Sequence, residues 1–212
     1  MPKISIPAGW CCAVCLFVMV AFTGLVADLL TKHWAFQALG MPEEYEAERS
    51  IYWVWQGVAG FQTTLNTGAL FGLGAGKTTF LVVLSLIFLV GLFCYAVLVA
   101  WRSLFLSAVL GMITAGVCGN LYDRLGWHGL VHPNFFWQHG EWHLNPMAGE
   151  PIYAVRDWLL VMIGTFHWPN FNIADALLVC SVILLLLHNH LFEAEKRNTE
   201  KLPPAPAERD VP

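Results

Sequence analysis

Three aspartates lie at the edges of long apolar runs. Asp28 follows the first run, Asp123 ends the third, and Asp175 lies near the start of the last. A charged side chain inside a bilayer costs roughly 2.5–3.5 kcal/mol on insertion scales, so an acid beside such a run needs a physical reason. If the apolar runs cross a membrane in turn, all three acids lie at the same end of the helices. We expect them to converge in one layer.

Two of these acids predict a peptidase site. Asp123 lies in the segment GNLYDR and Asp175 in the segment FNIAD. Two carboxyl groups held close together cannot both ionise cheaply, so they share a proton. The ionised group takes a proton from water while the protonated group donates to a peptide carbonyl oxygen, which hydrolyses the peptide without a covalent intermediate. We therefore expect Asp123 and Asp175 to be the catalytic residues.

The predicted helix ends indicate a role for each member of this pair. Asp175 lies near a helix N-terminus, whose partial positive charge favours the carboxylate, so we assign it as the base. Asp123 lies near a helix C-terminus, which favours its protonated form and the role of acid. Taken singly, either aspartate is better explained as a helix cap or an interfacial charge. The two together, each beside an asparagine, favour the catalytic interpretation.

Two other segments carry candidate supporting residues. Asp28 and Lys32 are four residues apart, which suits a helical ion pair. They form either a surface pair of little consequence or support for the site. The segment NTGALFG begins with Asn66, whose amide can both donate and accept, and its Gly68 lets an extended substrate approach closely. An ordinary turn before a helix explains that segment equally well.

Other motifs for bound groups are incomplete. The segment GLGAGKT at 72–78 is one residue short of a phosphate-binding loop. The pairs His128/His132 and His139/His143 have helical spacing, but glycines interrupt both, which argues against a zinc site. The net charge is -4 without a basic block, so nothing indicates a nucleic-acid partner. We expect neither a metal nor a cofactor.

The composition determines the kind of elements that must hold these residues. Of 212 residues, 57% are hydrophobic and 12% charged, whereas soluble domains carry about 25% charged residues. A spanning helix needs about 20 mostly apolar residues. Four stretches qualify: Ile4 to Ala27, Thr78 to Trp101, Ser103 to Tyr122 and Ile173 to Phe192. We predict an all-α membrane domain over residues 1–192 with four transmembrane helices, followed by a disordered cytoplasmic tail at 193–212.

The connecting segments set the expected orientation. Arg102 in a very short loop and the basic start of the tail favour cytoplasmic ends for the chain. The stretches 33–77 and 124–172 then face outside, and their many tryptophans predict an aromatic interfacial layer. Residues 51–65 have the composition of a small β-sheet. The apolar piece 158–166 is too short to span, so we predict an interfacial or re-entrant segment.

The sequence resembles the lipoprotein signal peptidases (signal peptidase II). Four blocks of that family match in order: D-x-x-[ST]-K at 28–32, N-x-G-A-x-F at 66–71, G-N-x-x-D-R at 119–124 and F-N-x-A-D at 171–175. The resemblance implies four membrane helices with a small extracytoplasmic sheet, in the bacterial inner membrane with both termini inside. It also implies a site near the outer face that cleaves diacylglyceryl prolipoproteins before the lipid-modified cysteine, and inhibition by globomycin-type peptides.

Carried over by motif, Asp123 and Asp175 are the expected catalytic pair. Substrate and catalytic groups would be positioned by Asn66, Asn120, Arg124 and Asn172. Asp28 and Lys32 would support the site, and Gly68 is a further substrate-binding or supporting residue. Two departures from the family pattern are extra residues near 41–49 and 128–151. A third is Arg156-Asp157-Trp158, which stands where the family has a V-D-F element.

Two alternatives remain open at the level of sequence. An intramembrane protease of the presenilin type would share the Tyr122-Asp123 pair but also needs a G-x-G-D segment, which is missing. A transporter or channel subunit would use its acids to relay protons or bind cations nearer the middle of the spans. The position of the acids at the span ends favours the protease.

Overall fold

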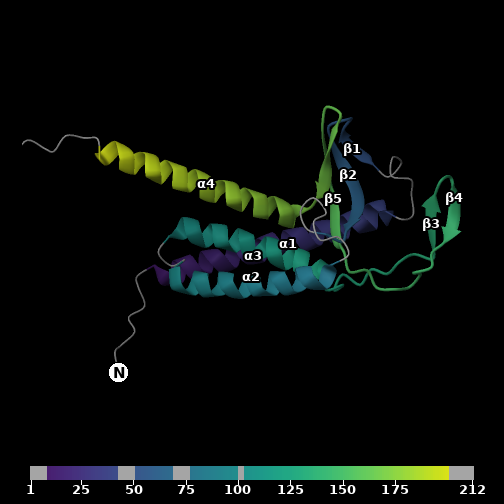
Figure 1. Cartoon of the computed structure of the whole chain (residues 1–212), viewed down its shortest axis with the longest axis horizontal. Coiled ribbons are helices and arrows are strands. Elements are labelled where there is room, and N and C mark those ends of the chain that lie inside the picture. Colours follow the sequence, from purple (N-terminus) through teal and green to yellow (C-terminus); the bar gives the residue numbers. More distant parts are fainter. Residues whose placement is uncertain (1–8, 43–50, 69–76, 100–102, 201–212) are drawn as a thin grey trace, which may run out of the picture.

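The structure, a computed structural model, describes residues 9–42, 51–68, 77–99 and 103–200. Four helices lie alongside one another: α1 (Trp10–Leu39), α2 (Thr78–Val99), α3 (Leu104–Arg124) and α4 (Ile173–Glu200). All four are long and apolar enough to cross a membrane, which confirms the prediction. Figure 1 shows the start of α1 and the end of α4 at the same end of the molecule, away from the sheet.

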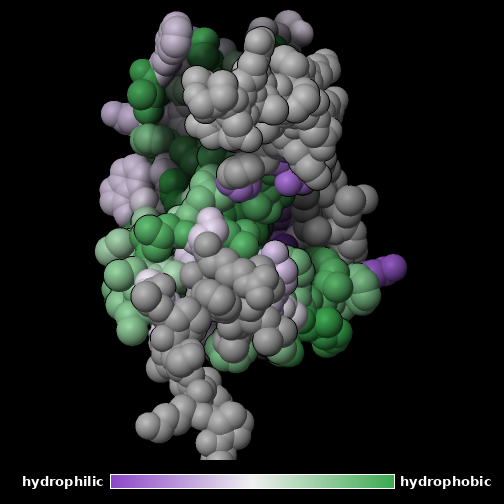
Figure 2. Space-filling model, turned by 90° about the vertical axis from the view of Figure 1, so that its left-hand side faces the viewer, coloured by the Kyte–Doolittle hydropathy of each residue, from purple (hydrophilic) through white to green (hydrophobic). Residues whose placement is uncertain are grey.

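The helix surfaces are those of a protein surrounded by lipid. Large hydrophobic side chains such as Phe22, Ile87, Phe93 and Leu186 are about two-thirds exposed. Seen from the helix ends that lie away from the sheet, most of the described surface is hydrophobic (Figure 2). In water such a surface would promote aggregation, whereas in a bilayer these side chains contact the lipid acyl chains.

Two of the helices extend beyond their predicted ends. α1 continues from the uncharged run to Leu39 and so carries Asp28 and Lys32 inside the helix. α4 continues to Glu200, which contradicts the predicted disorder for residues 193–200. The last twelve residues of the predicted tail, and Arg102 in the loop between α2 and α3, lie outside the described residues.

A four-stranded antiparallel sheet covers one end of the helices. Its order is β1 (Tyr52–Trp55), β2 (Ala59–Asn66), β5 (Val155–Ile163) and β6 (Phe166–Phe171). The sheet expected over residues 51–65 is therefore confirmed, but it is larger than expected. The short apolar piece at 158–166 belongs to β5, a central strand, and to the hairpin that leads into β6. It is not a re-entrant segment, because its backbone groups pair with β2 and β6.

Aromatic packing joins the sheet to the helices. The Trp34 ring, near the end of α1, meets Phe61 and Trp158 edge-on at centroid distances of 5.5 and 5.9 Å. The Thr63 hydroxyl donates to the Gly40 carbonyl oxygen at the end of the same helix. These contacts hold β2 and β5 against α1, so residues of these strands stay at a constant position relative to the helix ends.

The extra residues between α3 and β5 form a separate hairpin. Its strands are β3 (Phe135–Gln138) and β4 (Glu141–Leu144), and Val131 pairs with Pro151 at its base. Figure 1 shows this hairpin projecting beyond the sheet end of the helices. The extra residues at 43–49 lie outside the described residues.

Candidate active site

The N-terminus of α4 is capped by side chains from two helices. The Asn172 side-chain oxygen accepts from the Asp175 backbone N–H at 3.0 Å, and an Asp175 oxygen accepts from the Asn172 N–H at 3.4 Å. This reciprocal arrangement is a capping box. Asp28 of α1 accepts from the Ala174 N–H at 2.8 Å. The cap holds Asp175 in the first turn of α4.

A fully buried lysine connects α1 to α3. The Lys32 ammonium lies 2.7 Å from Asp28 Oδ2, 3.1 Å from Asp123 Oδ2 and 3.2 Å from the Asn120 side-chain oxygen. The lysine and both aspartates have no exposed area. An ammonium has three N–H donors, and three oxygens surround it here. The predicted Asp28–Lys32 pair is therefore formed inside the protein and not on its surface.

The Asp123 carboxylate contacts Arg156 as well as Lys32. Arg156 Nε and one of its terminal nitrogens donate to Asp123 Oδ1 at 3.1 and 2.8 Å. The Arg156 backbone N–H donates to Asp123 Oδ2 at 3.0 Å. Two basic side chains and a backbone donor therefore contact the two oxygens of the Asp123 carboxylate.

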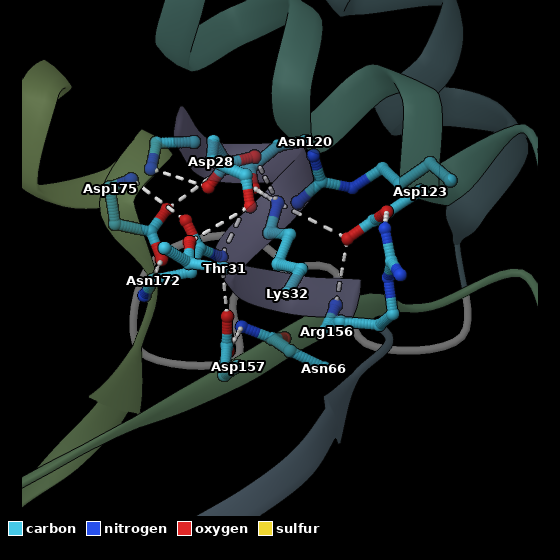
Figure 3. Close-up of polar contacts among 12 residues, drawn as sticks. Asp28, Thr31, Lys32, Asn66, Asn120, Asp123, Arg156, Asp157, Asn172 and Asp175 are labelled. Carbon is cyan, nitrogen blue, oxygen red and sulfur yellow. Dashed lines mark hydrogen bonds and ion pairs between the residues drawn. The ribbon is translucent and has the colours of Figure 1, made fainter. Parts of the chain in front are cut away.

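Asp157, the next residue on β5, receives two asparagine amides. Asn172 donates to Asp157 Oδ1 at 2.6 Å, and Asn66 donates to Asp157 Oδ2 at 3.1 Å. Backbone N–H groups fix both amides in this orientation, since Gly68 N donates to the Asn66 oxygen and Asp175 N to the Asn172 oxygen. Both amino groups therefore point at Asp157 (Figure 3).

Asp157 and Asp175 line the same cleft. The cleft has a volume of about 990 Å³ and lies between the sheet, α3 and α4. Its polar end carries Asn66, Asn120 and Arg124 beside the two acids, and Asn120 donates to Asp175 Oδ1 at 2.8 Å. Its other end is apolar and runs along α4 from Leu178 to Ile183. Asp123 is not among the described residues that line it.

Burial changes the acidity of Asp157. Removal from water raises the pKa of the Asp157 carboxyl to about 8, and the nearby Asp175 charge acts in the same direction. The hydrogen bonds from Asn66 and Asn172 and the charge of Lys32 oppose the rise without cancelling it. Asp157 is therefore protonated at neutral pH.

Acidic and basic side chains are clustered around the site. Four carboxyl groups and three basic side chains lie close together in this part of the structure: Asp28, Asp123, Asp157 and Asp175 with Lys32, Arg124 and Arg156.

Comparison with known proteins identifies the family. The family model described as signal peptidase (SPase) II matches residues 20–191. The chain is 37% identical to a lipoprotein signal peptidase of Rhodopirellula baltica over 182 residues, which cover 82% of this chain and 71% of the relative. The chain belongs to the signal peptidase II family. A lipoprotein signal peptidase of Clostridium novyi is 28% identical, covering 80% of this chain and 94% of the relative.

Solved structures support the same fold. A bacterial membrane enzyme at 2.3 Å resolution superposes with a TM-score of 0.62 and 22% identity, covering 92% of this chain and 94% of the other. Membership of the signal peptidase II family makes the chain an aspartic-type peptidase of a bacterial membrane. The sequence-based prediction of family, fold and enzyme class is confirmed.

Within this signal peptidase II fold, most of the predicted site residues come together. Asn66, Asn120, Arg124 and Asn172 surround the cleft or its acids, and Arg124 donates to the Gly68 carbonyl oxygen at 2.8 Å. Asp28 and Lys32 lie behind the cleft and hold α4 and α3. The remainder of the segment after Gly68 lies outside the described residues.

The structure does not place Asp123 beside Asp175 in the cleft, as the sequence led us to expect. Arg156 and Lys32 occupy both oxygens of Asp123, and Figure 3 shows Asp123 and Arg156 on the far side of Lys32 from Asp175. Asp157 is the acid that faces Asp175 across the cleft. The signal that could have found it was the resemblance of Arg156-Asp157-Trp158 to the V-D-F element. Asp157 does not border an apolar helix, so the search for acids at span edges missed it.

Proposed function

We propose that this peptidase removes signal peptides from lipid-modified prolipoproteins, with Asp157 and Asp175 as its catalytic residues. One observation carries the choice of residues: these two acids face one cleft, whereas Asp123 is buried among cations. The substrate class is supported by the names of the relatives, which are lipoprotein signal peptidases.

In the proposed reaction, a water molecule lies between the two acids and the scissile carbonyl carbon. Asp175 accepts a proton from the water, whose oxygen then bonds to that carbon. Asp157 donates its proton to the carbonyl oxygen, which gives a neutral tetrahedral diol. When the diol collapses, the proton on Asp175 passes to the leaving nitrogen and the C–N bond breaks. A diol proton returns to Asp157.

The shape of the cleft fits a substrate held partly in lipid. The acids lie at its polar end, and the side chains of Leu178, Val179, Val182 and Ile183 extend it along α4. An extended peptide near Gly68 and Asn66 and an apolar segment along α4 would occupy both parts. We propose cleavage just before a diacylglyceryl cysteine, whose acyl chains remain in the bilayer. Globomycin-type peptides would occupy the same cleft.

We also propose an orientation. The sheet and the polar end of the cleft would face the outer side of the bacterial inner membrane, and both chain ends would be cytoplasmic. This proposal is supported by the shared location of the start of α1 and the end of α4, away from the sheet. A lipid-anchored scissile bond lies at headgroup depth, which matches the position of acids at the helix ends.

The deciding experiment is cleavage of a purified diacylglyceryl prolipoprotein, followed by gel shift. We expect Asp157→Asn and Asp175→Asn each to lower turnover by about 10³-fold or more, because each removes a proton-transfer group. Asp123→Asn, the matched control, should retain turnover above both. Unfolding temperatures of all three variants show whether each is folded. Normal turnover in Asp157→Asn would remove that residue from the catalytic pair.

A further inference from the structure

Arg156 contacts Asp123 in two different ways. Its guanidinium donates twice to one carboxylate oxygen, and its backbone N–H donates to the other. Both residues are buried, since Arg156 is 4% exposed and Asp123 is fully enclosed. The end of α3 therefore holds the main chain as well as the side chain of one residue of β5. Charge-assisted hydrogen bonds of this kind are about twice as strong as neutral ones.

This residue immediately precedes Asp157. Successive side chains of a strand point to opposite faces, so when Arg156 faces Asp123, Asp157 faces the other way. In the sheet, Arg156 pairs with Leu65 and Asp157 with Thr64 of β2. The β2–β5 pairing is irregular between Phe61 and Thr64, so the ladder alone gives β5 a less regular support just beside Asp157. The contact with α3 supplies a second attachment at this point.

α3 also determines where Asp175 lies. Asn120 of α3 donates to Asp175 at 2.8 Å, and Lys32 joins Asn120 to Asp123. α3 therefore contacts Asp175 directly through Asn120. It is linked to Asp157 through Asp123, which contacts the neighbouring Arg156. The distance between the two acids depends on these two attachments together.

We propose that Arg156 is a positioning residue for proteolysis, which fixes β5 to Asp123 so that the Asp157 carboxyl faces Asp175. The inference rests on the proposed catalytic role of Asp157. Arg156 does not border the cleft among the described residues, so its loss should alter the chemical step more than substrate binding. A misplacement of reacting groups by about 1 Å can cost about 10²-fold in rate.

The test compares three variants by kcat and KM on a purified diacylglyceryl prolipoprotein. Arg156→Lys keeps the charge and the backbone donor but loses the paired guanidinium contacts. Arg156→Gln removes the charge. The double variant Asp123→Asn/Arg156→Gln removes both charges together, so that no unpaired buried carboxylate is left and folding is retained. We expect kcat to fall about 10-fold in Arg156→Lys and about 100-fold in the other two, with KM within twofold.

Leu160→Ala is the matched control, because Leu160 lies on the same strand and face as Arg156 and is 1% exposed. It should lower the unfolding temperature while leaving kcat per folded enzyme within twofold. Wild-type kcat in folded Arg156→Lys, or in the folded double variant, would overturn the inference and leave Arg156 as a stabilising charge only. Normal turnover in Asp157→Asn would instead contradict the proposed catalytic role of Asp157, on which this inference rests.

Discussion

Asp123 and Asp157 differ in the side chains that surround them. Asp123 and Asp157 are both buried, but Asp123 meets Lys32 and Arg156, whereas Asp157 meets two neutral amides and the charge of Asp175. Removal from water and the Asp175 charge raise the pKa of the Asp157 carboxyl and so favour its protonated form. The roles proposed for them, a structural contact for Asp123 and a proton donor for Asp157, follow from these different surroundings.

Turnover should fall as the pH rises through about 8, the pKa to which burial and Asp175 raise the Asp157 carboxyl. The sign follows from the role of Asp157: a raised pKa keeps the proton on at neutral pH, and the donor is lost above it. Steady-state kcat between pH 6 and pH 10 measures this limb. Unfolding temperatures over the same range serve as the control. A kcat that stays level or rises to pH 10 would contradict the assignment of Asp157 as the acid.

At the level of elements, close packing of α3 against α4 brings the site together. A side chain at Gly116 would meet the Ala174 carbonyl oxygen and Leu178 Cγ, both at 2.6 Å. A side chain at Gly119 would overlap Asp28 Oδ2. These two glycines let α3 approach the N-terminus of α4 until Asn120 reaches Asp175. Larger residues there would separate α3 from α4 and so Asn120 from Asp175.

Gly116→Ala should therefore destabilise the protein by about 1–3 kcal/mol, the usual cost of overpacking. Gly91→Ala is a matched control, because Gly91 lies in α2 and a side chain there meets nothing within 4 Å. The control should be neutral or stabilising by up to about 1 kcal/mol, since alanine favours helix more than glycine does. Thermal unfolding in detergent compares the two. Equal unfolding temperatures for both variants would show that the α3–α4 contact tolerates expansion.

At the level of the whole molecule, the four helices carry one polar layer at a single end. The sheet closes that end, and Trp34, Phe61 and Trp158 join it to α1. The cleft begins under the sheet and continues along the apolar side chains of α4. The proposed substrate, part peptide and part lipid, would meet a polar site and an apolar surface in one continuous space.

The proposed orientation predicts a labelling pattern in intact cells. In a variant whose six native cysteines are replaced, a cysteine at the exposed Glu141 of the projecting hairpin should react with a membrane-impermeant maleimide. A cysteine appended after Pro212 should react only once the inner membrane is permeabilised. The reverse pattern would place the sheet in the cytoplasm. Prolipoprotein cleavage by each variant confirms that the protein remains folded.

Sequence alone determined the membrane class, the four helices, the family and most residues of the site. Apolar runs of spanning length and short motifs are local features, which can be recognised in the sequence without knowledge of the fold. Asp175 was found in this way, because it lies at the start of an apolar run of spanning length and within the segment FNIAD. The strand character of residues 158–166 was missed, because a short apolar run does not distinguish a central strand from an interfacial segment.

Only the tertiary structure decided which aspartate faces Asp175. Asp123 and Arg156 are 33 residues apart, and their contact depends on β5 packing against the end of α3. Arg156 and Lys32 contact both oxygens of Asp123, and Asp123 does not line the cleft among the described residues. The next residue on the strand then points to the opposite side and becomes the acid in the cleft. The role proposed for each aspartate depends on which basic side chains lie next to it. Those side chains are distant in the sequence, so only the packing of the fold brings them there.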